Sequence, residues 1–164
     1  MTQTQSQSSS DPETLHLPRI LCLHGGGVNA EQKVTEQFGP DEALTQFKFG
    51  VLMAGRAPLI TLDHRLQHPP PIVDAAMLSS EFKDWPKSNK GDHVLSIPTL
   101  HVHGLRDGGM EQHRILLNNY CETGTTTLIE WDGGHRIPIK SHDVGAVVQE
   151  ILRLAKDAGV QLPN

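Results

Sequence analysis

Ile97-Pro-Thr-Leu-His-Val-His-Gly-Leu-Arg-Asp107 is the stretch of sequence that decides the fold. The run up to His103 is short and mostly apolar and ends at Gly104, which is the pattern of a buried strand in a parallel sheet. Pro98 is tolerated at the start of such a strand, because no ladder donor is needed there. Asp107 therefore follows the carboxyl end of a strand, where open parallel sheets place their functional groups.

Three other segments have the same pattern of a short apolar run that ends in a turn. They are residues 19–23, 47–54 and 125–131. Glycines follow each of them closely, and β-branched residues are frequent in the last one. We expect all three to be strands of the same sheet.

Helical patterns separate these strands. We expect one helix from about Met110 to Cys121, and weaker helices over residues 72–82 and within residues 29–46. The last helix has the clearest pattern, with Ser141 as its expected N-cap and Gly159 as the left-handed residue after its end. The alternation predicts an α/β fold, a three-layer α/β/α sandwich around a short, mostly parallel sheet.

Length and composition fit one globular domain behind a polar tail. The chain has 164 residues, and residues 1–17 are rich in Ser, Gln and Thr, so we expect a disordered tail and one domain over residues 18–164. The net charge is −5 and no basic stripe is present, which argues against nucleic acid as a partner. The apolar runs are too short to span a bilayer, so we expect no membrane association.

The first residues and the cysteines indicate the compartment. The Ser/Gln/Thr-rich start has neither the apolar core of a secretory signal nor the arginines of a transit peptide. Cys22 and Cys121 do not form a disulfide framework, so we expect free thiols in preference to a bridge. These features favour the cytoplasm.

Two loops after the late strands carry candidate catalytic residues. Asp107 could orient an imidazole as a catalytic acid, or it could simply cap the helix that follows. His135, which comes after two glycines, could act as a general base, or it could be an ordinary surface histidine. The order Asp then His, after successive late strands, matches α/β hydrolases and favours the catalytic interpretation of the pair.

A third loop, His24-Gly-Gly-Gly27, follows the first predicted strand. Backbone without side chains lets N–H groups approach a developing oxyanion, so Gly25 and Gly26 are candidates for an oxyanion hole. A tight turn that needs positive φ angles is the alternative explanation.

Four blocks of the chain occur in the order of a known family. They are Ile20–Glu31, Phe47–Pro58, Ile97–Asp107 and Asp132–Pro138. Together they resemble the FSH family of serine hydrolases, and the similarity covers nearly everything from Arg19 to the last helix. The resemblance implies a reduced form of the α/β-hydrolase fold.

Members of that family are esterases or thioesterases, and several fungal members release polyketide chains from their synthases. The resemblance implies that Asp107 is the acid, that His135 is the base and that the backbone near Gly25 and Gly26 forms part of the oxyanion hole. It also implies a small acyl ester or thioester as substrate, which a polyketide synthase could deliver. No cofactor or metal is implied.

The chain departs from the family pattern at the nucleophile. It has no Gly-x-Ser-x-Gly motif, and no serine lies between Glu31 and Phe47. The missing stretch should include the strand before the elbow, the helix behind it and a neighbouring strand. The other serines considered lie outside a strand-to-helix turn; they are Ser79, Ser80, Ser88, Ser96 and Ser141. The nucleophile therefore stays unassigned, and we expect weak activity or none.

Three alternatives remain open from the sequence. The chain could be a pseudoenzyme that binds an acyl substrate or a protein partner without turnover. It could also reflect a truncated gene or a missed exon. The third is a metal site, because His101 and His103 lie on one face of a predicted strand and Asp107 and His135 could be near.

Overall fold

A computed structural model describes residues 47–61, 65, 67–79 and 82–161. The predicted tail over residues 1–17, the predicted strand over residues 19–23 and the weak helix within residues 29–46 lie outside these residues.

The described part of the chain contains a three-stranded parallel sheet in the order β1-β4-β5. Its strands are β1 (Gly50–Met53), β4 (Thr99–Gly104) and β5 (Thr126–Trp131). The central strand, β4, is buried along its whole length. These strands fall within or beside the three segments predicted here. β1 begins at Gly50 instead of residue 47, and it ends at Met53 because Ala54, with φ 53°, turns the backbone out of the extended conformation.

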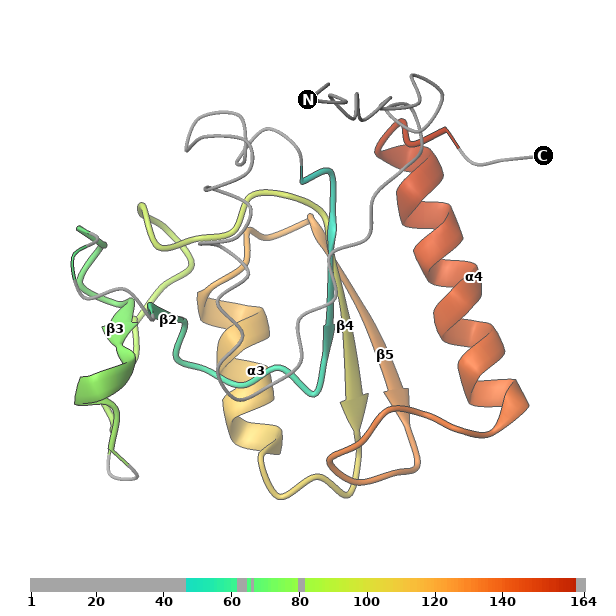
Figure 1. Cartoon of the computed structure of the whole chain (residues 1–164), viewed down its shortest axis with the longest axis horizontal. Helices are drawn as coiled ribbons and strands as arrows, with labels where there is room; N and C mark the ends of the chain where they lie inside the picture. The colour runs from blue at the N-terminus through green and yellow to red at the C-terminus, as the bar shows by residue number, and fades with distance from the viewer. Residues whose placement is uncertain (1–46, 62–64, 66, 80–81, 162–164) are drawn as a thin grey trace, which may run out of the picture.

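Two helices cover the sheet. Figure 1 shows α3 (Met110–Asn119) and α4 (Ser141–Asp157) on opposite sides of β4 and β5. This arrangement confirms the predicted three-layer α/β/α fold with a short parallel sheet.

The end of α4 follows the prediction and its beginning does not. Gly159, with φ 73°, donates to the Lys156 carbonyl while Val160 donates to the Ala155 carbonyl, which is a Schellman cap. The prediction of Ser141 as N-cap is wrong, because Ser141 is already the first helical residue. Lys140 occupies the cap position with extended backbone, and its side chain makes no capping hydrogen bond.

The helix predicted over residues 72–82 is also not present in the described part of that range, residues 72–79 and 82. β3 (Val73–Asp74) instead pairs in parallel with β2 (Ile60–Thr61), and a short 3-10 helix, η2 (Ala75–Met77), follows. The Val73 N–H donates to the Leu59 carbonyl at 3.0 Å, and the Asp74 carboxylate accepts from Ala76 N–H at 2.8 Å. Tertiary pairing therefore overrides a weak helical pattern here.

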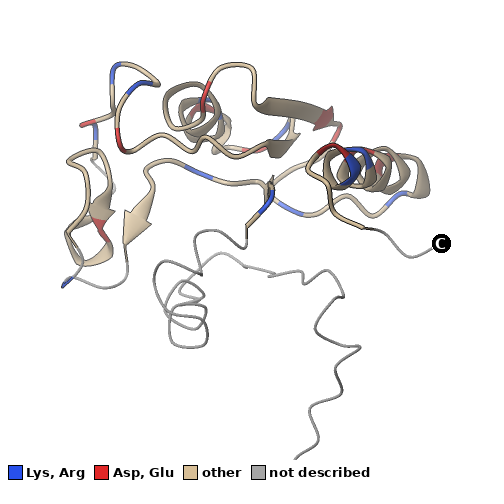
Figure 2. Cartoon of the chain, turned by 90° about the horizontal axis from the view of Figure 1, so that it is seen from above, with Lys and Arg blue, Asp and Glu red and all other residues tan. Residues whose placement is uncertain are grey.

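Charges of both signs are mixed over the molecule, as Figure 2 shows. On α4, for example, Arg153 pairs with Glu150 and with Asp157. Among the residues with described structure, no helix is both long and apolar enough to cross a membrane.

The two faces of β4 differ in chemistry. Side chains alternate along a strand, so Leu100 and Val102 face one way and Thr99, His101 and His103 face the other. The apolar side packs with Trp131, Val147 and Leu154 into the core beneath α4. The polar side faces α3, where the His103 ring lies 5.2 Å from the His113 ring.

Candidate active site

Loops that leave β1, β4 and β5 converge at the carboxyl edge of the sheet. The loop after β4 carries Asp107, and the loop after β5 carries His135. His135 Nδ1 lies 2.7 Å from Asp107 Oδ2. The structure therefore brings together the acid and base candidates identified in the sequence. Gly25 and Gly26, the oxyanion-hole candidates, lie outside the described residues.

Glycine at position 104 allows the close approach of these two loops. A Cβ at Gly104 would collide with the backbone carbonyls of Gly133 and Gly134. The loops are also joined directly, because Arg106 N–H donates to the Gly133 carbonyl at 2.8 Å. This contact places His135 beside the acid loop.

Four donors surround the buried carboxylate of Asp107. Oδ1 accepts from Gly109 N–H at 2.7 Å and from Arg56 at 3.2 Å, while Oδ2 accepts from His113 at 2.8 Å and from His135 at 2.7 Å. Burial disfavours the charged carboxylate, but the hydrogen bonds from Gly109, His113 and His135 outweigh it and hold the pKa of Asp107 well below its usual range.

The alternative role of Asp107 as a helix cap is partly realised. The N-cap residue of α3 is Gly109 and makes no side-chain capping bond. Asp107 instead closes a turn just before the helix by accepting the Gly109 N–H on Oδ1. Since Oδ2 faces the two histidines, one carboxylate serves both the turn and the imidazoles.

His135 is held in one tautomer by its partner. An ionised carboxylate only accepts hydrogen bonds, so Nδ1 of His135 carries the proton that points to Asp107. Nε2 is then free to accept a proton, and the side chain is 55% exposed. Arg56, whose NH2 group lies 3.4 Å from Nδ1, adds positive charge beside the ring.

His113 is a site residue that the sequence reasoning missed. Its side chain is fully buried on α3, with Nε2 2.8 Å from Asp107 Oδ2 and Nδ1 2.6 Å from the Gly55 carbonyl. A signal was available in the helical spacing, because His113, Leu116 and Tyr120 recur on the buried face of the predicted helix. Arg56, on the loop after β1, lies within the block Phe47–Pro58, and no local pattern indicates its contact with Asp107.

The alternative of a metal site that joins His101 and His103 to Asp107 and His135 is not supported by the geometry. Both rings are buried under α3. His101 Nε2 lies 3.4 Å from Cys121 Sγ, and neither nitrogen of His103 has a hydrogen-bond partner in the part of the chain that the structure describes. Among the described residues, the possible ligand atoms that cluster within 4.8 Å belong to Asp107, His113 and His135.

This second cluster is poorly suited to a divalent cation. The Arg56 guanidinium lies 3.2 Å from Asp107 and 3.4 Å from His135, so a metal ion there would face a fixed positive charge. The carboxylate already accepts four hydrogen bonds, two of which come from the histidines that would have to turn their lone pairs toward the ion.

Within the described ranges, no serine or cysteine side chain forms a hydrogen bond with His135, which donates to Asp107 and lies beside the Arg56 guanidinium. Ser141 opens α4 and Ser88 lies in the loop before β4, where its carbonyl bonds His93. Cys121 is a free, buried thiol whose pKa is raised by burial, so it is not an activated nucleophile.

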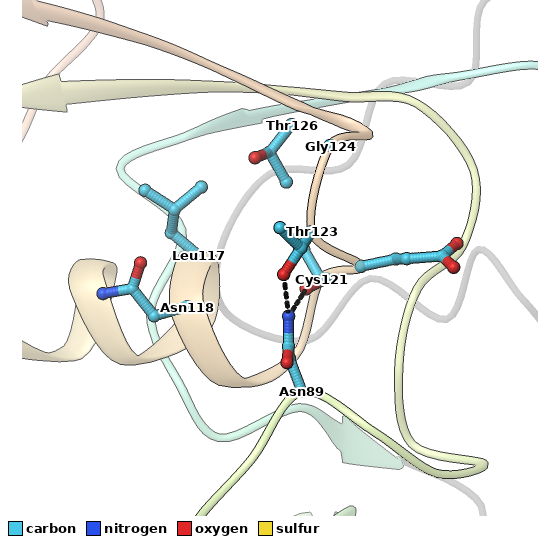
Figure 3. Close-up of a pocket in the computed structure, with 8 residues that line it drawn as sticks. Asn89, Leu117, Asn118, Cys121, Thr123, Gly124 and Thr126 are labelled. Atoms are coloured by element: carbon cyan, nitrogen blue, oxygen red, sulfur yellow. Dashed lines mark hydrogen bonds between the residues drawn. The ribbon is translucent and has the colours of Figure 1, made fainter.

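A small cavity of about 180 Å³ lies at the opposite edge of the sheet. Figure 3 shows it beside Thr126, the first residue of β5, and Cys121, just after α3. Its wall is closed by Asn89, which donates to the Cys121 carbonyl at 3.3 Å and to Thr123 Oγ1 at 2.6 Å. The cavity is thus separate from the Asp107–His135 pair.

Comparison with known proteins gives a consistent picture. The family model described as serine hydrolase (FSH1) matches residues 32–147. Esterase claE of Penicillium crustosum is 46% identical over 133 residues, which cover 79% of this chain and 49% of claE. Esterase dbaE of Emericella nidulans is 45% identical over 140 residues, which cover 80% of this chain and 50% of dbaE. The chain thus spans about half the length of these two relatives. No solved structure matches it.

A third relative aligns along almost its whole length. Esterase pigG of Monascus ruber is 47% identical over 263 aligned positions, which cover 93% of this chain and 96% of pigG. Because this chain has 164 residues, at least 99 of those positions have no counterpart in it.

Proposed function

Because this chain belongs to the FSH1 serine hydrolase family, we propose that Asp107 and His135 are the acid and the base of an esterase-type active site. The observation that carries the proposal is the 2.7 Å contact between Asp107 Oδ2 and His135 Nδ1, at the carboxyl edge of a parallel sheet. A carboxylate and an imidazole in this relation are two members of a Ser-His-Asp triad.

The chemistry follows from the tautomer. His135 Nε2 takes the proton of an attacking hydroxyl and returns it to the leaving group, while Asp107 stabilises the imidazolium that forms between these steps. The proton on Nδ1 stays between the two residues throughout. The low pKa of Asp107 keeps the carboxylate charged at neutral pH, as this role requires.

The nucleophile is the part that this chain lacks. A serine on a strained strand-to-helix elbow would have to stand within hydrogen-bond reach of His135 Nε2, and no Gly-x-Ser-x-Gly motif is present. The aligned positions of pigG without a counterpart here support an internal loss of that segment. We therefore propose that this chain hydrolyses esters weakly or not at all.

We propose small acyl esters or thioesters as the substrate class, including polyketide chains presented by a synthase. The support is family membership together with relatives that are named esterases. Backbone near Gly25 and Gly26 remains our proposal for the oxyanion hole.

A second candidate is a pseudoenzyme that binds an acyl ligand or a protein partner without turnover. The observation that favours it is that the Asp107–His135 pair is fully formed while no serine in the described residues contacts it. Labelling with a fluorophosphonate probe tests the missing nucleophile, which both candidates assume. A labelled serine in the present chain would contradict the missing nucleophile.

The decisive experiment restores the missing part. We would take the segment of pigG that has no counterpart in this chain and insert it between Glu31 and Phe47. Hydrolysis of a p-nitrophenyl ester is then measured. The present chain should give background rates, and the restored chain should be active.

In the restored chain, His135→Gln should lower kcat by about 10³-fold or more, because a triad loses most of its rate enhancement when any one of its three residues is removed. His142→Gln is the matched control, since His142 is an exposed histidine on α4. If the restored chain is active and His135→Gln leaves kcat unchanged, the assignment of the base is wrong.

A further inference from the structure

We propose that His113 is a buried imidazolium that donates from both ring nitrogens and thereby fixes the Asp107 carboxylate where it faces His135. His113 is then a positioning residue, since it acts through Asp107. The value of this role for catalysis rests on the proposed function, whereas the charge of His113 does not.

Hydrogen-bond accounting requires two protons on this ring. Nδ1 lies 2.6 Å from the Gly55 carbonyl, which can only accept. Nε2 lies 2.8 Å from Asp107 Oδ2, and an ionised carboxylate also only accepts. A neutral imidazole has a single N–H donor, so one of its lone pairs would face an oxygen at contact distance. The doubly protonated ring satisfies both contacts.

The missing proton could in principle sit on Asp107, but the surroundings of the carboxylate argue against this. Gly109 N–H and Arg56 donate to Oδ1, and His135 donates to Oδ2 together with His113. A protonated carboxyl would lose these charge-assisted contacts. The pKa of Asp107 is held well below its usual range by the same hydrogen bonds, against the effect of burial.

Burial makes the charged pair interdependent. The side chains of His113 and Asp107 are both fully buried. A charge in such a place persists only when it is paired, and removal of one partner leaves the other uncompensated. Asp107 is the anion that allows His113 to keep its charge, and His113 in turn keeps the carboxylate from rotating away.

The other charged and titratable groups around His113 come from three further segments. The His103 ring on β4 lies 5.2 Å away, the His135 ring is stacked at 6.1 Å, and Arg56 reaches the far oxygen of Asp107. None of these contributes a negative charge. Among the residues that the structure describes, the Asp107 carboxylate is therefore the counter-charge of the buried ring.

The same bonds connect three parts of the site. Through its two nitrogens, His113 on α3 joins the backbone after β1, at Gly55, to the acid loop after β4. The position of Asp107 relative to His135 is thus set by a residue that touches no substrate. Asp107 Oδ2 accepts from two parallel imidazoles, whose planes differ by 12°.

The test is a ¹⁵N NMR measurement of histidine rings in the full chain at pH 7 to 8, with resonances assigned through bonds. We expect both ring nitrogens of His113 to have the shifts of protonated nitrogens, with slowly exchanging N–H protons. The exposed His142 on α4 serves as the comparison ring in the same spectrum. A neutral, single-tautomer signal for His113 at pH 7 would overturn the proposal.

Asp107→Asn tests the dependence on the counter-charge. It should convert His113 to a ring with one proton, whereas Asp132→Asn, at an exposed carboxylate of the β5–α4 loop, should leave the His113 signals in place. Retention of both His113 protons in Asp107→Asn would contradict the coupling. The wild-type spectrum decides the charge state even if this variant does not fold. None of these readouts uses turnover, so a failure here is distinct from a failure of the proposed esterase activity.

Discussion

The two faces of β4 belong to one strand of six residues, but alternate side chains give them different chemistry. On the α4 side, Leu100 and Val102 join an apolar core in which burial alone supplies the stability. On the α3 side, Thr99, His101 and His103 bury polar atoms, several of which have no hydrogen-bond partner among the described residues. Burial of unpaired polar groups costs stability, so the α3 face is the weaker half of the sheet.

This difference indicates how the domain divides its tasks. The α4 side holds the sheet together, and the α3 side leads by way of His103 and His113 to the carboxylate of Asp107. Sites commonly accept a local loss of stability that is compensated elsewhere in the fold. The comparison can be tested by changing one face at a time.

The largest expected effect is on stability in acid. Burial lowers the pKa of His101 and of His103 from 6.5 to about 4, and for His103 the neighbouring histidines add to the effect. In the window between these pH values both groups bind more protons in the unfolded chain than in the folded chain, so their contribution to stability is complete above pH 6.5 and is lost as the pH drops toward 4. We expect a loss of several kcal/mol across this window, at about 1.4 kcal/mol for each unit of pKa difference.

Urea denaturation at a series of pH values measures this loss. Asp107 contributes outside the window, because its pKa lies below the usual carboxyl range and its stabilisation is lost only at lower pH. A flat stability profile from pH 6.5 to pH 4 would contradict the neutral, buried state of the two histidines.

The next effect concerns the apolar face. Leu100→Ala removes a fully buried side chain from the core under α4 and should lower the free energy of unfolding by about 3 kcal/mol. The exposed Leu105 provides a matched control, since Leu105→Ala should change stability by less than about 0.5 kcal/mol. Similar losses for the two variants would mean that the α4 face is not the stabilising one.

The smallest effect is expected on the polar face, where a substitution should increase stability, whereas the two changes above decrease it. His103→Leu replaces a buried ring, whose two nitrogens have no hydrogen-bond partner among the described residues, by an apolar side chain. It should raise the free energy of unfolding at pH 7 by about 1 kcal/mol. It should also flatten the acid profile. His93→Leu is the control, because the ring of His93 bonds the carbonyls of Ser88 and Asn119 and its removal should destabilise the protein. Destabilisation of His103→Leu by more than 2 kcal/mol would show that His103 has a structural partner.

Local patterns predicted the elements that are most regular. The strands at β4 and β5 have apolar runs closed by glycines, and α4 ends in a Schellman cap at Gly159, as its sequence indicates. The helix expected over residues 72–82 was wrong because backbone pairing with Ile60–Thr61 competes with a weak helical preference. The N-cap of α4 was misplaced by one residue, which is the usual uncertainty of helix ends.

The sequence by itself determined that an acid and a histidine follow consecutive late strands, and therefore that Asp107 and His135 meet at one edge of a parallel sheet. This is possible because strand patterns are local and the carboxyl ends of parallel strands share an edge. Only the tertiary structure decided what surrounds the carboxylate. Arg56 reaches Asp107 across 51 residues of sequence, and the Gly55 carbonyl meets His113 across 58. No periodicity encodes such contacts, since they depend on how α3 and the loop after β1 pack against β4.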